Sequence, residues 1–273
     1  MGRLPPGSKP PLWRNPITGM MATRPIQGTA VETIPLLQLG IALLPALAVI
    51  GIQLAWAQPT GQSWYALARM LAQLLLVGYA LTYIFAADHP GPVLAVLAVM
   101  IAASCWIALG NVPGVRRQLL APGLGAIAIA GFGVLALVAG PVLRIEPWYQ
   151  PSILIPLAGM IFSAAMNSVS LAGERLYAEL ERADDYLVAR DAAFRAALIP
   201  VLNSFFAVGL VTLPGMMTGQ ILSGVSPLVA ARYQIVVMAM VLGASGIAAA
   251  LFLHWIRDRA VRPQGRESAR GDL

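Results

Sequence analysis

Long apolar stretches, separated by short polar connections, run along most of this chain. Each is near the roughly 20 residues that an α-helix needs to cross the hydrocarbon core of a bilayer. The pattern predicts seven spans, at about 33–57, 64–86, 92–110, 122–142, 151–172, 197–219 and 231–255. We therefore expect an all-α, polytopic membrane protein with one membrane domain over 31–258.

The two ends of the chain differ from this apolar domain. Residues 1–30 are polar and rich in Pro, Gly and Arg, and they lack the apolar core of a signal peptide. We expect a disordered tail there, and Met20 and Met21 offer later starts. Residues 259–273 are predicted to form a basic cytoplasmic tail.

The connection at 173–196 differs in kind from the others. It places Leu176, Leu180, Leu187 and Phe194 at helical spacing with charged residues between them. This pattern predicts an amphipathic helix on the cytoplasmic side, continuous with the fifth span. Such a helix either lies on the membrane surface or binds a soluble partner, and its many charged residues favour binding of a partner.

The composition agrees with a membrane protein. The chain is 58% hydrophobic and 11% charged, with a mean hydropathy of +0.75, whereas a soluble domain has about 25% charged residues. The net charge of +6 does not indicate nucleic-acid binding, because the arginines lie in tails and connections rather than on a basic, aromatic-interleaved face. With seven spans, twelve of the 18 basic residues lie on the side of the C-terminus, so the positive-inside rule predicts the N-terminus outside and the C-terminus in the cytoplasm.

The sequence lacks the motifs of several enzyme and transporter classes. It has no G-x-x-x-x-G-K-[ST] loop, and Lys9 is its only lysine, so any ATP hydrolysis would belong to another subunit. It has no H-E-x-x-H motif, and His89 and His254 lie at opposite ends of different spans. The single cysteine, Cys105, is best interpreted as a packing residue. No span has a central Asp or Glu, which argues against ion-coupled transport. We expect neither a catalytic site nor a bound cofactor, and the sequence leaves any metal site unknown.

A few polar side chains remain at membrane depth. Asn167, Asn203 with Ser204, and Arg69 followed by Gln73 lie within predicted spans. Amide side chains in lipid need partners, so we expect them to face the interior of the bundle. They either bond neighbouring helices or line a substrate path. The methionines leave a similar choice between apolar packing and soft metal ligation, and they are Met160, Met166, Met216 and Met217.

Helix-breaking and small residues concentrate between Arg195 and Met240. Such residues are tolerated at membrane depth only where protein covers the backbone or a cavity needs irregular geometry. Pro214 should kink or interrupt the sixth span, and Gly215 with Gly219 forms a G-x-x-x-G pair that permits close helix approach. The candidate hinge or interface residues are Pro200, Pro214, Gly215, Gly219 and Gly224.

The chain resembles the FetB (YbbM)-type permeases, the membrane subunits of a small ABC transporter family linked to iron export, which includes plant aluminium-tolerance permeases. The matching segments are PLAGMIFSAAMNSVSLAGERL at 156–176, RAALIP at 195–200, VGLVTLPGMMTGQILSG at 208–224 and PLVAARYQI at 227–235, with a weaker match at 69–85. The resemblance implies a seven-span subunit in the bacterial inner membrane. It also implies a homodimer and a separate cytoplasmic ATPase.

The resemblance implies an exporter for iron or another metal, and we expect it to work by alternating access. The substrate path would involve Asn167, Asn203, Met160, Met216 and Met217. ATPase docking would involve Glu179, Arg182, Asp185 and Arg190.

Two features separate the chain from typical members of that family. The N-terminal tail is extra, and the loop from Gly173 to Arg195 is short and lacks an L-G-A-T-x-x-x-A-like element before RAALIP. The alternatives are therefore a permease for a nucleotide-sugar or another organic solute, or a non-transporting membrane scaffold derived from permeases.

Overall fold

The computed structural model describes residues 34–85, 89–112, 114–182 and 185–261. The expected tail at 1–30 and residues 262–273 lie outside this part of the chain. The described residues are mainly helical, in the order α1 (Leu36–Ala42), α2 (Leu44–Ala55), α3 (Gly61–Ile84), α4 (Pro90–Ala108), η1 (Leu109–Asn111), α5 (Arg116–Leu137), η2 (Val138–Val142), α6 (Pro151–Leu180), α7 (Tyr186–Ala207), α8 (Gly215–Leu222) and α9 (Pro227–Val261). The expected all-α, polytopic membrane fold is confirmed.

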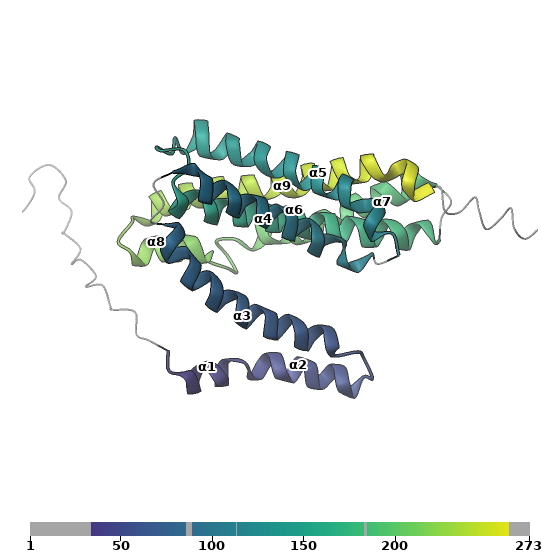
Figure 1. Cartoon of the computed structure of the whole chain (residues 1–273), viewed down its shortest axis with the longest axis horizontal. Coiled ribbons are helices and arrows are strands. Elements are labelled where there is room, and N and C mark those ends of the chain that lie inside the picture. The colour runs from purple at the N-terminus through teal and green to yellow at the C-terminus, as the bar shows by residue number, and fades with distance from the viewer. Residues whose placement is uncertain (1–33, 86–88, 113, 183–184, 262–273) are drawn as a thin grey trace, which may run out of the picture.

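Helix α6 lies at the centre of a bundle and packs against α4, α5, α7 and α9 (Figure 1). It has 30 residues, which corresponds to about 45 Å and exceeds the hydrocarbon thickness of about 30 Å. Its core positions, such as Ala158, Ile161, Phe162 and Ala165, are fully buried. The bundle therefore buries a continuous apolar stripe of α6 along most of its length.

Small residues allow the bundle helices to approach one another. Gly131 on α5 lies directly against the ring of Phe162 on α6, so that a Cβ at Gly131 would clash with it. Gly173 on α6 faces Phe252 on α9, whose ring lies 3.5 Å from the position of a Cβ. Close packing through small residues replaces the hydrophobic effect as the source of helix association in lipid.

A proline inside α5 links this helix to α9. Pro122 has no N–H, so the carbonyl of Gln118 one turn earlier loses its helical partner. Arg259 of α9 donates from Nη1 to that carbonyl over 3.3 Å. Arg259 belongs to the last turn of α9, which continues to Val261.

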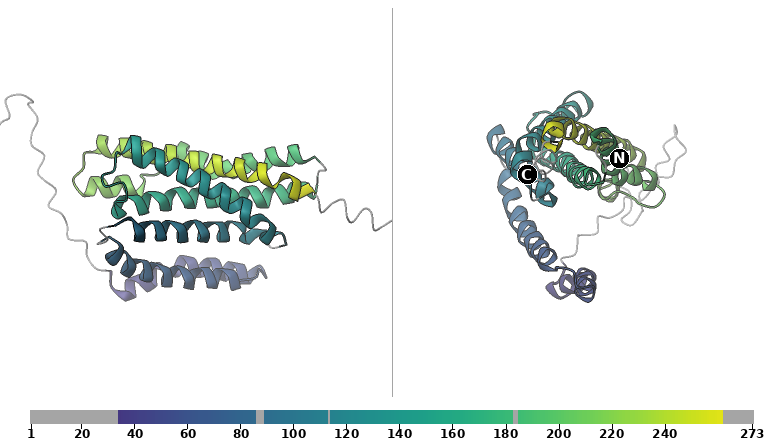
Figure 2. Two further views of the ribbon diagram at one scale, coloured as in Figure 1. Left: turned by 45° about the horizontal axis from the view of Figure 1, so that its top comes forward. Right: turned by 90° about the vertical axis from the view of Figure 1, so that its right-hand side faces the viewer.

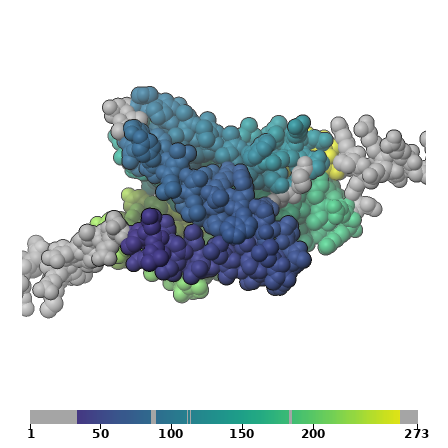
Figure 3. Space-filling view, turned by 60° about the horizontal axis from the view of Figure 1, so that its bottom comes forward, coloured from purple at the N-terminus to yellow at the C-terminus, as the bar shows by residue number. Residues whose placement is uncertain are grey.

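Helices α1 to α3 stand apart from this bundle (Figure 2). Ile50 is the only buried residue on α1, α2 and α3 as described. Many of their side chains are large, apolar and exposed, including Leu36, Leu75 and Tyr79. Figure 3 views the face on which these helices project. Their surface is therefore left for lipid or another protein to cover.

Within the described residues, six segments are long and apolar enough to span a membrane, and they correspond to the predicted spans except 197–219. That predicted span is interrupted. Helix α7 ends at Ala207, a non-helical segment follows, and α8 begins at Gly215 after Pro214. The predicted interruption at Pro214 is therefore present, whereas the total of seven spans stays a prediction.

The chain from α7 to α8 still runs alongside α9, although its helix is interrupted. The Tyr186 hydroxyl at the start of α7 donates to the carbonyl of Leu253 near the end of α9. Leu213 and Met217 lie beside Ala231 and Gln234 near the start of α9. The chain from α7 to α8 thus runs from one end of the bundle to the other, with a break in its helix.

The expected single amphipathic helix over 173–196 is corrected by the structure. Residues 173–180 extend α6, as continuity with the fifth span predicted, but a new helix begins at Tyr186. Asp185 caps this second helix, because its Oδ1 accepts a hydrogen bond from the Leu187 N–H at 2.8 Å. Leu176 and Leu180 are buried in the bundle rather than lying on a membrane surface.

Candidate functional site: a polar cavity among three helices

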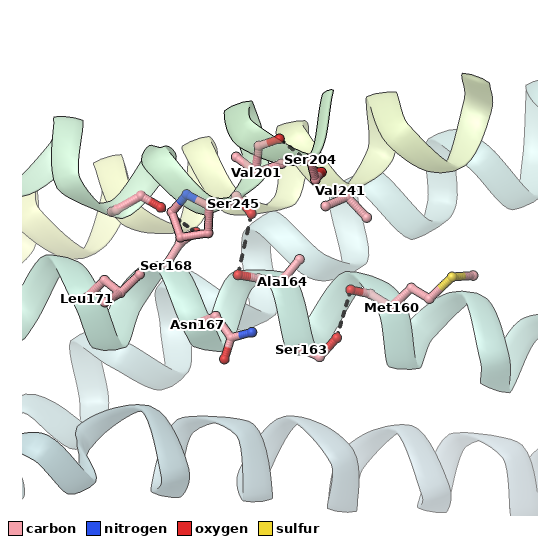
Figure 4. A pocket seen from close by; sticks show the side chains of 12 residues that line it. Met160, Ser163, Ala164, Asn167, Ser168, Leu171, Val201, Ser204, Val241 and Ser245 are labelled. Atoms are coloured by element: carbon pink, nitrogen blue, oxygen red, sulfur yellow. Dashed lines mark hydrogen bonds between the residues drawn. The ribbon is translucent and has the colours of Figure 1, made fainter. Parts of the chain in front are cut away.

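A cavity of about 310 Å³ lies between α6, α7 and α9 (Figure 4). Its lining mixes hydroxyl and amide groups with small apolar side chains. The lining residues are Met160, Ser163, Ala164, Asn167, Ser168, Leu171, Ala197, Pro200, Val201, Ser204, Val241 and Ser245.

Helical spacing brings these residues to one place. On α6 the lining positions follow steps of three and four residues from Met160 to Leu171, and on α7 they do so from Ala197 to Ser204. Residues with this spacing share one face of a helix. The cavity is therefore the meeting point of a polar face of α6, a face of α7 and two positions of α9.

Four serines of the lining donate their hydroxyl protons to backbone carbonyls (Figure 4). Two of these bonds join helices: Ser168 on α6 donates to Ala197 on α7 over 3.4 Å, and Ser245 on α9 donates to Ala164 on α6 over 3.4 Å. Because each proton is used internally, each serine oxygen keeps lone pairs that can accept a hydrogen bond or contact a cation. The cavity wall is thus richer in acceptors than in donors.

Asn167 is the main exception among the polar groups of the lining. Its amide extends from α6, and no other described residue forms a hydrogen bond with it (Figure 4). The residue is exposed in the single chain. An amide at membrane depth without a partner is costly, so this position calls for a ligand, water or another protein.

The backbone near the cavity is also irregular. Pro200 lines it and has no N–H to bond the carbonyl of Ala196 one turn earlier. Beyond Ala207 the chain forms an isolated bridge between Val208 and Thr212, and Gly209 takes a left-handed φ of 81°. An L-residue at Gly209 would be strained, which explains the glycine at this turn. The helix that lines the cavity thus ends in a non-helical segment.

The structure separates the predicted path residues into two groups. Met160, Asn167 and the predicted hinge residue Pro200 lie together at the cavity. Asn203, Met216 and Met217 are not part of its lining, and Met217 instead lines a separate cavity of about 380 Å³ between α8 and α9. Asn203 lies on α7 and is exposed.

Sequence reasoning missed Ser163, Ser168 and Ser245 as lining residues. The spacing of Ser163, Asn167 and Ser168 on one helix face was the available signal on α6. Ser245 carried no such signal, because only the packing of α9 against α6 brings it to the cavity.

The predicted docking residues lie around the turn between α6 and α7. Arg182 and Asp185 are exposed, Glu179 pairs with Arg175 at 2.5 Å, and Arg190 pairs with Asp191 at 2.6 Å. This turn joins the two helices that supply most of the cavity wall. A force applied at the turn would therefore reach the cavity directly.

Gly215 and Gly219, the glycine pair of α8, have free space beside them in the single chain. A Cβ at Gly215 or Gly219 would meet nothing within 4 Å. Gly224, which follows α8, has a left-handed φ of 92°. Neither glycine of the pair serves packing within the described part of this chain, so that face of α8 remains available to a partner.

Comparisons with known proteins agree on one family. Residues 36–261 match the family described as "Uncharacterised protein family (UPF0014)". The chain belongs to the UPF0014 family. A UPF0014 membrane protein of Synechocystis is 38% identical over 203 residues, which cover 67% of this chain and 76% of the relative.

Two further relatives connect this UPF0014 chain with named proteins. The "Probable iron export permease protein FetB" of Escherichia coli is 31% identical over 199 residues, covering 67% of this chain and 75% of the relative. The "UPF0014 membrane protein STAR2" of Oryza sativa is 30% identical over 275 residues, covering 93% and 88%. No solved structure matches the chain. The expected resemblance to FetB-type permeases is confirmed.

Proposed function

We propose that this UPF0014 protein is the permease subunit of an ABC-type exporter for iron or another metal. The observation that carries the proposal is the polar cavity between α6, α7 and α9, next to an interrupted helix, in a chain similar to an iron export permease. In this proposal the protein is an inner-membrane homodimer with its C-terminus in the cytoplasm. A separate ATPase subunit supplies the energy.

The proposed mechanism is alternating access. The ATPase binds the turn between α6 and α7 through the exposed Arg182 and Asp185, with Glu179 and Arg190 beside them. Nucleotide-driven movement of this turn shifts α6 against α7 and so reshapes the cavity. The non-helical segment at 208–214 absorbs the movement, because its backbone is not held by a helical ladder.

The chemistry of the lining defines what the cavity can hold. Serine oxygens, backbone carbonyls and the Asn167 amide are oxygen donors for a cation, and Met160 adds a soft sulfur. Among the described residues, no group of three or more His, Cys, Asp or Glu side chains could hold a metal ion. The cation would therefore be bound as a transient substrate by weak ligands, rather than as a resident metal.

A second candidate is an organic solute, such as a nucleotide-sugar. The uncharged, hydrogen-bonding lining supports it, since hydroxyl and amide groups recognise sugar hydroxyls well. Both candidates use the same cavity and the same partner ATPase.

The test is reconstitution of the purified permease with candidate ABC ATPase subunits from the same organism. We expect the two chains to co-purify, and we expect iron to stimulate ATP hydrolysis and to leave loaded vesicles. Stimulation by a nucleotide-sugar but not by iron would replace the metal with the organic solute. Failure of any ATPase to co-purify would overturn the exporter proposal and support a membrane scaffold.

A further inference from the structure

A second groove, of about 500 Å³, lies where the start of α7 meets the end of α9. One part of its wall is apolar and includes Leu187, Phe194 and Leu251. The other part carries Arg190, His254 and Arg257. The groove is therefore amphipathic, with an apolar part and a cationic part.

The charges in the groove are not balanced. Asp191 is the only acidic residue of the lining, and it is already bonded by Arg190, through Nε at 2.9 Å and Nη2 at 2.6 Å. Arg257 forms no ion pair with any described residue. The side chains facing the groove thus leave at least one positive charge without a counter-charge.

The groove also lies at a membrane boundary. From Val236 to Leu253 helix α9 has no charged residue and Ser245 as its one polar side chain, and its polar C-terminal end begins at His254. Trp255, half-exposed on the next position, is typical of the interfacial layer where aromatic residues gather. On α9 the apolar Leu251 therefore belongs to the hydrocarbon side of the groove and Arg257 to the headgroup side.

The two walls of the groove are fixed to each other. The hydroxyl of Tyr186 on α7 donates to the Leu253 carbonyl on α9, and Tyr186 is buried. This bond ties the first turn of α7 to the last turns of the α9 span. The two helices that form the groove are therefore held together by a hydrogen bond, which fixes the two walls relative to each other.

We propose that this groove binds one anionic phospholipid, whose phosphate contacts Arg257 and whose acyl chain lies along Leu251 and Phe194. The order of Leu251 and Arg257 along α9 matches the order of chain and headgroup in such a lipid. Basic pockets between membrane helices at the headgroup level bind anionic lipids in this way. The inference needs only that α9 spans the membrane, so it stands apart from the proposed transport activity.

The test compares lipid retention by the full-length protein and by charge variants. The protein is placed in nanodiscs of phosphatidylcholine with phosphatidylglycerol, and retained lipids are counted by native mass spectrometry. We expect Arg257→Gln to weaken retention of phosphatidylglycerol about fivefold, as for loss of one cation at an anionic surface.

The matched control is Arg195→Gln, which removes the same charge from the exposed side of α7, outside the groove. We expect it to retain the lipid, and circular dichroism checks that all variants fold. Equal loss in Arg195→Gln would reduce the effect to net charge and overturn the proposal, as would no loss in Arg257→Gln.

Two further results would assign the groove to another ligand. If inorganic phosphate in phosphatidylcholine nanodiscs raises the thermal unfolding midpoint as much as phosphatidylglycerol does, the ligand is a soluble phosphate compound. If Arg257→Gln keeps its lipid but no longer binds the ATPase subunit, the groove is a protein-docking site. Either result would overturn the lipid assignment.

Discussion

Single residues decide how closely the helices of this bundle approach. Gly131 on α5 has no side chain, and the buried ring of Phe162 occupies the space beside it. Gly133, two residues further along, faces open space. The two glycines therefore have different roles although they lie on the same helix.

Gly131→Ala should destabilise the bundle by about 1–3 kcal/mol, the usual cost of overpacking a filled core. The measurement is the thermal unfolding midpoint of the detergent-purified protein. Gly133→Ala is the matched control and should leave the midpoint unchanged or slightly higher, because alanine favours a helix over glycine. Equal effects of the two substitutions would contradict the assigned contact with Phe162.

Asn167 and Asn203 offer a second comparison between residues of one type. Asn167 lines the cavity and Asn203 does not. Asn167→Leu should abolish most export by the reconstituted transporter, because it replaces the amide with an apolar group at the cavity. Asn203→Leu should export at close to the unaltered rate. The reverse result would place the substrate path outside this cavity.

Tyr186 makes the stability of the α7–α9 joint sensitive to alkaline pH. Burial raises the pKa of Tyr186 to about 12, against the opposing effect of nearby Arg190 and Arg257. Because the folded pKa lies above the unfolded value of 10.0, the contribution to stability is complete below pH 10 and is lost as pH rises toward 12. Thermal unfolding of Tyr186→Phe should show a smaller loss over this window than that of the unaltered protein.

Among the elements, the interrupted pair α7–α8 differs most from an ordinary span. A backbone without a helical ladder must find hydrogen bonds at membrane depth, and it persists where protein covers it or a cavity needs it. The left-handed Gly209 and Gly224 lie on either side of Pro214 and α8. The segment is therefore the best candidate for an element that changes shape during transport.

Replacing Pro214 and Gly215 with alanine should abolish export while leaving membrane insertion intact. Alanine meets no neighbour at Gly215, so the loss would come from a stiffer segment rather than from a clash. The control is Gly133→Ala on α5, where a Cβ likewise meets nothing within 4 Å. Export by proteoliposomes is the measurement, and unchanged export in the Pro214 and Gly215 variant would refute the proposed role.

At the scale of the whole molecule, much polar and apolar surface remains uncovered in a single chain. The exposed Asn167 amide and the open glycine face of α8 lack neighbours among the described residues, and the projecting helices α1 to α3 leave most of their side chains exposed. Lipid can cover the apolar helices but offers nothing to an amide. These features together support the proposed homodimer.

The dimer can be tested by cross-linking in membranes. With the buried Cys105 replaced by serine, Gly219→Cys should form a disulfide between two chains, because G-x-x-x-G faces permit close approach. Val99→Cys, which lies exposed on α4, is the control and should not. Cross-linking of Val99→Cys alone would assign the interface to a different face.

Much of the architecture could be predicted from the sequence because lipid imposes a simple rule on composition. A span must be apolar for about 20 residues, so the spans at 64–86, 92–110 and 151–172 appear as helices close to the expected positions. The break at Pro214 was also predictable, because proline has no N–H to continue a helix.

Other features depended on which helices lie side by side. The sequence shows Ser163 and Asn167 on one face of a helix, but only tertiary packing adds Ser245, which bonds the carbonyl of Ala164, 81 residues earlier in the chain. Likewise, the charges around 173–196 suggested one surface helix, whereas the Asp185 cap and the buried Leu176 and Leu180 divide that segment between two bundle helices.

The sequence by itself therefore determined that this protein lies in a membrane, that its fold is all-α and that it belongs to this family. These conclusions follow from composition and local pattern. The tertiary structure decided which of the predicted path residues meet. Met160, Asn167 and Pro200 share a cavity, while Asn203, Met216 and Met217 lie outside it. Residues far apart in the chain meet only through the packing of α6, α7 and α9, and no local pattern records that packing.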